Sequence, residues 1–304
     1  MIKKYHSNGK LLLSGEYAVM EGALALAVPT RYGQSMTVTS IEAPQLVWSS
    51  FDVGGEIWYE AIIPIDSLIL PQAGRMENPI QETLVKLLAE AVKLNPSFLN
   101  KGYGYQVTTQ LDFPRDWGLG TSSTLINNIA QWAEVDAYAL LRNAFTGSGY
   151  DIACARHNVP ILYRLCEDLP IIEEVFFDPP FKNDLYFVHL NKKQDSREGI
   201  AQYGSQTFDR PKLVREISEI TKKILTCQTL VAFQALMVDH ENLLSAALRL
   251  QPVKALLFSD YNGCVKSLGA WGGDFVLAFG HGDTPSYFKE KGYEIIIPYT
   301  EMVL

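Results

Sequence analysis

The chain has 304 residues, of which 47% are hydrophobic and 20% charged, and its formal net charge is −8. This length favours two domains with sizeable cores, and the acidic balance argues against a nucleic-acid or membrane-surface binder. Four cysteines without a Cys-x-x-Cys pair indicate free thiols in a reducing compartment. No apolar stretch approaches the roughly 20 residues of a membrane span. Acidic residues also interrupt the apolar start of the chain, so we expect a cytoplasmic protein without a signal peptide.

Strands dominate the expected elements of the first part of the chain. Alternating or continuous apolar runs between turn residues predict strands within 3–40 and at 45–51, 56–63 and 103–113. A helix is expected at 79–94, because apolar residues recur there at helical spacing after Asn78-Pro79.

Helices become more frequent in the second part of the chain. They are expected at 122–133, 135–144, 194–205, 211–226, 229–249 and 256–261, with Asp151 at the start of another short helix. Strands are expected at 160–165, 173–177, 185–190, 275–279 and 293–298. Asp178-Pro179-Pro180 is the best boundary, which gives an N-terminal domain of residues 1–180 and a C-terminal domain of residues 181–304.

The stretch Trp117-Gly118-Leu119-Gly120-Thr121-Ser122-Ser123 lies between an expected strand and an expected helix. Glycines adopt backbone angles that other residues avoid, and the first amides of a helix, together with its dipole, favour a bound anion. The hydroxyl groups of Thr121, Ser122 and Ser123 can cap the helix or reach a metal ion or a phosphate oxygen. Taken alone, the stretch leaves open both a phosphate site and an ordinary glycine turn with a serine cap.

Several common catalytic patterns are absent from the sequence. There is no Walker phosphate loop, no Gly-x-Gly-x-x-Gly after a strand, no Gly-x-Ser-x-Gly and no His-Glu-x-x-His. The five histidines are scattered, and each is interpreted as a surface residue or a satisfied core residue.

Three stretches together resemble the motifs of the GHMP kinase superfamily, which includes galactokinase and the homoserine, mevalonate and phosphomevalonate kinases. They are residues 8–19 (Asn-Gly-Lys-Leu-Leu-Leu-Ser-Gly-Glu-Tyr-Ala-Val), residues 118–123 and residues 269–274 (Gly-Ala-Trp-Gly-Gly-Asp). Their order matches that of the superfamily. Gly147-Ser148-Gly149-Tyr150-Asp151-Ile152-Ala153 is similar to the Gly-Ser-Gly-Phe-Asp-Val-Ala run of phosphomevalonate kinases, and its Gly-Tyr-Asp-Ile-Ala core is typical of one subgroup of the superfamily.

The resemblance implies an α+β protein with the two-domain GHMP kinase fold. The N-terminal domain would carry a left-handed βαβ-type phosphate loop, the C-terminal domain would be ferredoxin-like, and the site would lie in the cleft between them. ATP and Mg²⁺ would be the cofactors. The acceptor would be a mevalonate- or phosphomevalonate-like acid or alcohol, and a homodimer is left open.

The resemblance also implies a role for individual residues. Asp151 would orient the acceptor hydroxyl or accept its proton, with a helix cap as the alternative. Lys10 would pair with Asp151 or with the transferred phosphoryl group, with a solvated side chain as the alternative. Ser122 would be a Mg²⁺ ligand. The ATP phosphates would be bound by Gly118, Leu119, Gly120, Thr121, Ser122, Ser123, Gly269, Gly272 and Gly273, and the acceptor by Glu16, Tyr17 and Gly149.

The sequence departs from the family pattern in two places. The region that matches a second Mg²⁺ ligand, Ala139-Leu140-Leu141-Arg142, has no carboxylate, and Glu134 and Asp136 are out of register. Trp271 replaces a glycine of the third motif, where it would stack on a ligand or narrow the site. These departures keep two alternatives open: a kinase-fold binding protein without turnover, and a diphosphomevalonate decarboxylase.

Overall fold

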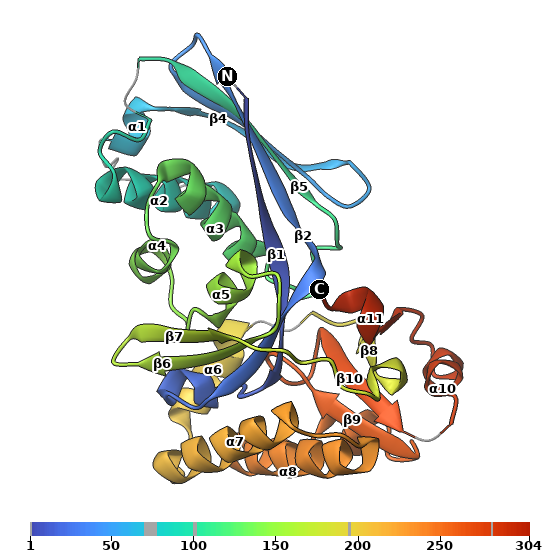
Figure 1. Ribbon diagram of the computed structural model, residues 1–304. Coiled ribbons are helices and arrows are strands. Elements are labelled where there is room, and N and C mark those ends of the chain that lie inside the picture. Colours follow the sequence, from blue (N-terminus) through green and yellow to red (C-terminus); the bar gives the residue numbers. More distant parts are fainter. Residues whose placement is uncertain (1, 70–77, 100–101, 194–195, 281) are drawn as a thin grey trace. The chain divides into compact units, whose positions relative to one another are not determined.

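The computed structural model describes residues 2–69, 78–99, 102–193, 196–280 and 282–304 (Figure 1). The chain forms two compact units that interleave along the sequence. Unit 1 contains residues 1–9, 32–115 and 120–156, and unit 2 contains residues 10–31, 116–119 and 157–304. The single domain boundary expected near residue 180 therefore stays a prediction, and the two units are described separately below.

Unit 1 contains a mixed sheet. Its strands are β4 (Ile57–Pro64), β3 (Gln45–Phe51), β5 (Gly104–Leu111), the end of β2 (Ala25–Ile41) and the start of β1 (Ile2–Ser14), a strand that pairs with β2. The β3–β4 and β2–β5 pairs are antiparallel, whereas β3 and β5 run parallel. Strands β3, β4 and β5 lie within two residues of the expected ranges, because their apolar alternation follows the pleat.

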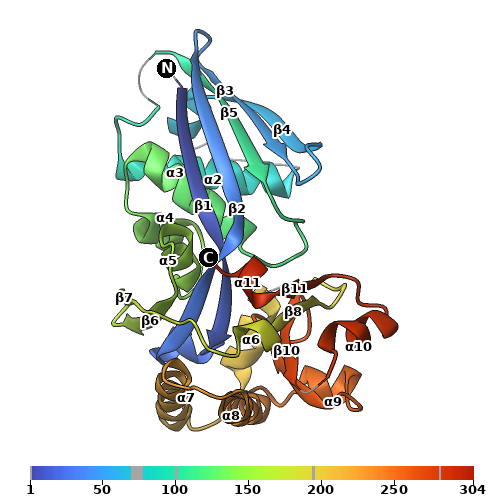
Figure 2. The ribbon, with the colours of Figure 1, turned by 45° about the vertical axis from the view of Figure 1, so that its right-hand side comes forward.

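The helices of unit 1 are α1 (Asp66–Ile69), α2 (Pro79–Leu94), α3 (Thr121–Ala133), α4 (Ala137–Ala144) and α5 (Tyr150–Arg156). The expected helix at 79–94 is confirmed, and the Asn78 side chain caps it by accepting a hydrogen bond from the Ile80 amide at 2.9 Å. Helix α3 packs against α2, α4 and α5, and Figures 1 and 2 show α2 and α3 along one face of the sheet. Residues 120–156 therefore form three helices, α3, α4 and α5, with α3 packed against the other two.

Unit 2 contains a four-stranded antiparallel sheet in the order β11 (Ile296–Pro298), β8 (Tyr186–His189), β10 (Phe275–Gly280) and β9 (Gly263–Ser267). Strand β9 is not predicted by its sequence, because Lys266 interrupts a short apolar run. All five residues of β9 are nevertheless buried. A lysine within a buried strand requires local charge partners, which α8 and the turn after β1 supply.

A second set of strands in unit 2 joins the start of β2 to the hairpin β6 (Ile161–Cys166) and β7 (Leu169–Glu174). The strand expected at 173–177 has the wrong bounds, because β7 begins earlier, at Leu169. The hairpin turn is formed by Glu167 and Asp168, which have φ angles of 48° and 62°. Two non-glycine residues with positive φ give no strong turn signal in a sequence, although this geometry suits a two-residue hairpin.

The helices of unit 2 are η1 (Ala18–Glu21), η2 (Lys182–Asp184), α6 (Ser196–Ser205), α7 (Arg210–Leu225), α8 (Leu230–Leu248), α9 (Val253–Leu257), α10 (Thr284–Glu290) and α11 (Tyr299–Met302). Helix α7 packs against α8 and η1, and α8 packs against β9. The final residues of strand β1 (Ile2–Ser14), from Leu11 to Ser14, are all buried, and the chain then continues into η1. In the part of the chain that the structure describes, no helix is long and apolar enough to cross a membrane.

Candidate functional site

Helix α3 begins without a side-chain cap. Its N-cap residue is Gly120, with a φ of 96°, and the preceding Gly118 has a φ of 66°. The alternative left open by the sequence, an ordinary glycine turn with a serine cap, is therefore not supported. Because no capping side chain occupies the helix start, its first-turn amides keep their donor capacity, and the helix dipole makes this end favourable for an anion.

The first turn of α3 contains both buried, hydrogen-bonded hydroxyl groups and an exposed one. Ser123 and Thr124 are buried, and both donate hydrogen bonds to the Gly120 carbonyl, at 2.9 and 3.1 Å. Thr124 also donates to the side chain of Gln34 at 2.9 Å. Ser122 is exposed, and its hydroxyl has no hydrogen-bond partner among the described residues. Of these three side chains, Ser122 is the one available to a ligand.

All three family-like stretches contribute to unit 2 and come into contact there. The Lys10 amide in β1 donates to the Leu119 carbonyl at 3.0 Å. A Cβ atom on Gly118 would collide with the carboxylate of Asp274. Gly118 is thus required both by its positive φ and by this close contact. The geometry fixes the backbone of residues 118–119 against the first and third motifs.

Trp117 anchors the same stretch within unit 2. Its ring packs edge-on against Phe275, with 5.4 Å between centroids, and lies 6.4 Å from the His189 ring. A ring nitrogen of His189 lies 3.3 Å from the Asp116 carbonyl oxygen. These contacts hold the start of the stretch on strands β8 and β10.

The glycines of the third motif differ from Gly118. Gly269 and Gly272 have φ angles of 57° and 107°, but an added Cβ on either would meet no described atom within 4 Å. Their positive φ, rather than a close approach, accounts for the glycine at these two positions. Gly273 is buried. The third motif approaches the second through Asp274, and open space adjoins Gly269 and Gly272.

Trp271 belongs to the core of unit 2. The residue is 4% exposed and packs in a cluster with Tyr17, Tyr203 and Leu248. The buried ring has no exposed face on which a ligand could stack, so that expectation is wrong, whereas the expectation that Trp271 narrows the site stays a prediction. Trp271 has a φ of 54°, and its ring is buried among the apolar side chains of this cluster.

Asp151 is the second residue of α5 in unit 1. The Gly149 carbonyl accepts from the amides of Ile152 and Ala153 at 3.1 and 3.2 Å, and Gly149 has a φ of 85°. The half-buried Asp151 side chain makes no capping hydrogen bond among the described residues, so the helix-cap alternative has no support. Helix α5 packs against α3, the helix whose start carries Ser122.

Two acidic residues near the expected second metal ligand have structural roles. Asp136 caps α4 by accepting from the Ala139 amide at 2.7 Å. Glu134 ends α3 in a left-handed conformation and lies 4.0 Å from the Lys3 ammonium. Across the described ranges, no group of three His, Cys, Asp or Glu residues could hold a metal ion. The expectation that Ser122 is a Mg²⁺ ligand stays a prediction.

Glu16 and Tyr17 are buried in unit 2. The Glu16 carboxylate lies 2.7 Å from the Lys266 ammonium, and the Tyr17 ring stacks on Tyr203 at 5.3 Å. Burial and the neighbouring Glu16 carboxylate raise the pKa of Tyr17. Their role as acceptor contacts stays a prediction, since both side chains have structural partners. Sequence reasoning missed Lys266, because β9 itself was missed.

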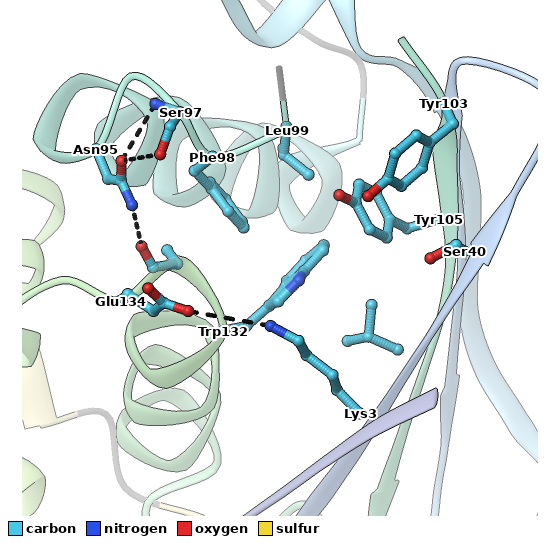
Figure 3. A pocket seen from close by; sticks show the side chains of 12 residues that line it. Lys3, Ser40, Asn95, Ser97, Phe98, Leu99, Tyr103, Tyr105, Trp132 and Glu134 are labelled. Atoms are coloured by element: carbon cyan, nitrogen blue, oxygen red, sulfur yellow. Dashed lines mark hydrogen bonds and ion pairs between the residues drawn. The ribbon is translucent and has the colours of Figure 1, made fainter. Parts of the chain in front are cut away.

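A cavity of about 300 Å³ lies in unit 1 at the C-terminal end of α3. Figure 3 shows Phe98 and Tyr105 on opposite sides of it with Trp132 between them, and the Lys3–Glu134 ion pair nearby. The candidate phosphate stretch lies at the opposite, N-terminal end of the same helix. This cavity is therefore separate from the candidate site.

Comparisons with solved structures identify the fold. The chain has the α+β fold of the GHMP kinases, so the predicted fold class is confirmed. The mevalonate kinase of Methanococcus jannaschii matches with a TM-score of 0.71 and 14% identity, over 97% of this chain and 96% of that one. The phosphomevalonate kinase of Streptococcus pneumoniae, solved with phosphomevalonate and AMPPNP, matches with a TM-score of 0.69 and 15% identity, over 95% of both chains.

Sugar kinases share the same fold. The galactokinase of Lactococcus lactis, solved with galactose, matches with a TM-score of 0.69 and 14% identity, over 95% of this chain and 88% of that one. No protein-family model matches the sequence, and no curated protein matches it. At these identities the comparisons establish the fold and leave the acceptor to be determined.

Proposed function

We propose that this chain is an ATP- and Mg²⁺-dependent small-molecule kinase of the GHMP superfamily, and that its acceptor is a mevalonate- or phosphomevalonate-like molecule. One observation carries the proposal. The uncapped start of α3 follows two positive-φ glycines, and the exposed Ser122 hydroxyl has no hydrogen-bond partner in the part of the chain that the structure describes. A helix start of this kind favours phosphate groups. The shared fold with mevalonate and phosphomevalonate kinases supports the acceptor class.

The proposed roles follow the chemistry of each group. The amides of residues 118–123 would donate to the ATP phosphates, and Lys10 would neutralise charge on the transferred phosphoryl group. Asp151 would orient the acceptor hydroxyl for in-line attack on the γ-phosphorus of ATP. It would take up the hydroxyl proton as the new O–P bond forms and the bond from the γ-phosphorus to the β,γ-bridging oxygen breaks, with ADP as the leaving group. Mg²⁺, when bound, supplies positive charge that offsets the charge on the phosphates, with Ser122 as its protein ligand.

The missing second carboxylate favours one competing function. Because Glu134 and Asp136 are occupied elsewhere, a kinase-fold binding protein without turnover would also fit this metal site. A diphosphomevalonate decarboxylase is the other competitor, since it would use the same fold for phosphorylation followed by loss of CO₂.

The test measures ADP release from Mg²⁺-ATP with mevalonate, phosphomevalonate, diphosphomevalonate, homoserine and a panel of sugars. We expect turnover with one mevalonate-like acid and a decrease of about 10²- to 10⁴-fold in Asp151→Asn. Asp168→Asn is the matched control, because this exposed hairpin residue has a left-handed conformation that asparagine also adopts.

Three outcomes would overturn the proposal in different ways. ATP binding without turnover on any acceptor would identify a binding protein. Release of CO₂ with diphosphomevalonate would identify the decarboxylase. Turnover with a sugar and with no other acceptor would support the proposed kinase activity but contradict the proposed mevalonate-like acceptor.

A further inference from the structure

The cavity at the C-terminal end of α3 has no part in the proposed function. Its volume is about 300 Å³, and its twelve lining residues come from β1, β2, β5 and α3 or adjoin the ends of α2, α3 and β5. All of these residues belong to unit 1. A hollow of this size that combines aromatic rings with a few polar groups is the usual form of a small-molecule site.

Aromatic rings form the apolar part of the cavity. The Trp132 ring packs edge-on against Phe98, with 4.8 Å between centroids, and edge-on against Tyr105 at 5.3 Å. Tyr103 extends this row, since its ring lies 5.4 Å from that of Tyr105. The row of four rings offers contact area to an apolar or aromatic group of a ligand.

Hydrogen bonds hold one wall of the cavity in place. The Asn95 side chain donates to the Ala133 carbonyl at 2.8 Å and accepts from the amide and the hydroxyl of Ser97, at 3.1 and 2.7 Å. These bonds join the chain after α2 to the end of α3 (Figure 3). Because the wall is built without a ligand, less conformational freedom is lost when one binds.

One ammonium group and one carboxylate group face each other beside the rings. Lys3 and Glu134 are the only charged side chains among the twelve lining residues, and they lie 4.0 Å apart next to Trp132 (Figure 3). Their side chains are 49% and 77% exposed, and neither makes a hydrogen bond with another described residue. An exposed pair at this distance is weak, so both groups keep the capacity to bind a ligand.

The backbone of Glu134 supports a further use of its carboxylate. Glu134 ends α3 with a φ of 57° and a ψ of 44°, which is the left-handed conformation. Helix ends of this geometry favour glycine, because a Cβ atom is strained there. The loose pair with Lys3 contributes too little to offset this strain. A second partner for the carboxylate would account for a glutamate at this position.

We propose that this cavity binds a small zwitterion with an apolar side chain, of the α-amino acid class. The ligand's ammonium group pairs with Glu134, its carboxylate pairs with Lys3, and its side chain packs on the rings of Phe98, Tyr105 and Trp132. A zwitterion gives each of the two charged groups a counter-charge. A ligand with a single charge has to displace one partner of the Lys3–Glu134 pair, which lowers its affinity.

The test measures binding to the full chain by isothermal titration calorimetry, without nucleotide. The probes are phenylalanine and leucine, with glycine, phenethylamine and 3-phenylpropanoate as partial analogues. We expect phenylalanine or leucine to bind. Each analogue lacks the apolar side chain, the carboxylate or the ammonium group, and should bind at least about tenfold more weakly.

Two variants separate binding from folding. Glu134→Gly should weaken binding by about tenfold or more and leave Tm equal or higher, because glycine adopts the left-handed conformation without strain. Asp168→Gly is its matched control, since this exposed residue has a φ of 62° in the hairpin of unit 2 and should leave binding unchanged. Lys3→Met should also weaken binding about tenfold, whereas Lys222→Met, which removes the exposed pair with Glu219 on α7, should not.

Three outcomes would overturn the proposal. The first is absence of binding by both phenylalanine and leucine. The second is phenethylamine or 3-phenylpropanoate binding as tightly as phenylalanine, which would assign the cavity to an organic cation or an organic anion. The third is unchanged affinity in Glu134→Gly and Lys3→Met, which would place the amino acid elsewhere. None of these readouts requires phosphoryl transfer, so a failure of the kinase proposal would be seen separately.

Discussion

The turn after β1 and the turn before α3 share one backbone feature but have opposite surroundings. Both place a glycine of positive φ before polar residues. In the first turn, Glu16 and Tyr17 are buried against charged and aromatic partners from α8, β9 and α6. In the second turn, Ser122 is exposed and unpartnered among the described residues. The elements that pack against each turn, rather than the residue types in the motif, therefore decide whether a polar side chain is structural or available to a ligand.

The largest expected effect tests the structural side of this comparison. Tyr17→Ala removes a ring stacked on Tyr203 within the core of unit 2. We expect the free energy of unfolding to decrease by about 3–5 kcal/mol, as for other large-to-small changes of buried aromatic residues. Denaturant unfolding measures this loss, and Tyr17→Phe is the conservative control. A fully stable Tyr17→Ala protein would show that the ring serves a ligand rather than the core.

An intermediate effect separates the two kinds of hydroxyl at the start of α3. Thr124→Val should decrease the free energy of unfolding by about 1–3 kcal/mol, because it leaves the buried Gln34 side chain without its donor. Ser122→Ala should change it by less than about 0.5 kcal/mol, since that hydroxyl is exposed.

We expect the opposite order for enzymatic activity, with Ser122→Ala causing a larger loss than Thr124→Val. If Ser122 is the Mg²⁺ ligand, Ser122→Ala should lower kcat/KM and raise the Mg²⁺ concentration required for half-maximal turnover. Chemical unfolding and a Mg²⁺ titration of turnover measure the two effects. A Ser122→Ala enzyme with an unchanged Mg²⁺ requirement would remove this residue from the metal site.

The smallest expected effect is a pH dependence at His240. Burial, together with the Lys266 charge, lowers the pKa of this imidazole well below its ordinary value of 6.5. The unfolded chain therefore binds a proton that the folded chain does not, so the stability supplied by neutral His240 is present above about pH 6.5 and lost as pH falls. The limiting slope is about 1.4 kcal/mol per pH unit.

His240→Gln isolates this contribution. The difference in free energy of unfolding between the wild-type protein and His240→Gln should be constant above about pH 6.5 and should decrease below it. Contributions from Glu16 and Glu241 have the opposite sign with pH, because their raised pKa values stabilise the fold at lower pH. Parallel curves for the two proteins would contradict the buried neutral imidazole.

Much of the fold could be predicted from local patterns. The helix at 79–94 matches its predicted range, because its Asn78-Pro79 start and apolar spacing are encoded within the helix itself. Helix α10 also has a proline start after Asp283, a local signal of the same kind. The second strand of the hairpin at 161–174 was predicted too late in the chain, since the turn residues are Glu167 and Asp168 rather than glycines.

Local sequence was enough to predict the glycine turn, the following helix and the resemblance of three separated stretches to one kinase superfamily. These features depend on backbone propensities and motif order, which residues carry locally. Only the tertiary structure placed Trp271 in a core, exposed Ser122 and brought Lys266 to Glu16. Burial and charge pairing decided these positions, because they depend on residues that lie up to 250 positions apart in the chain.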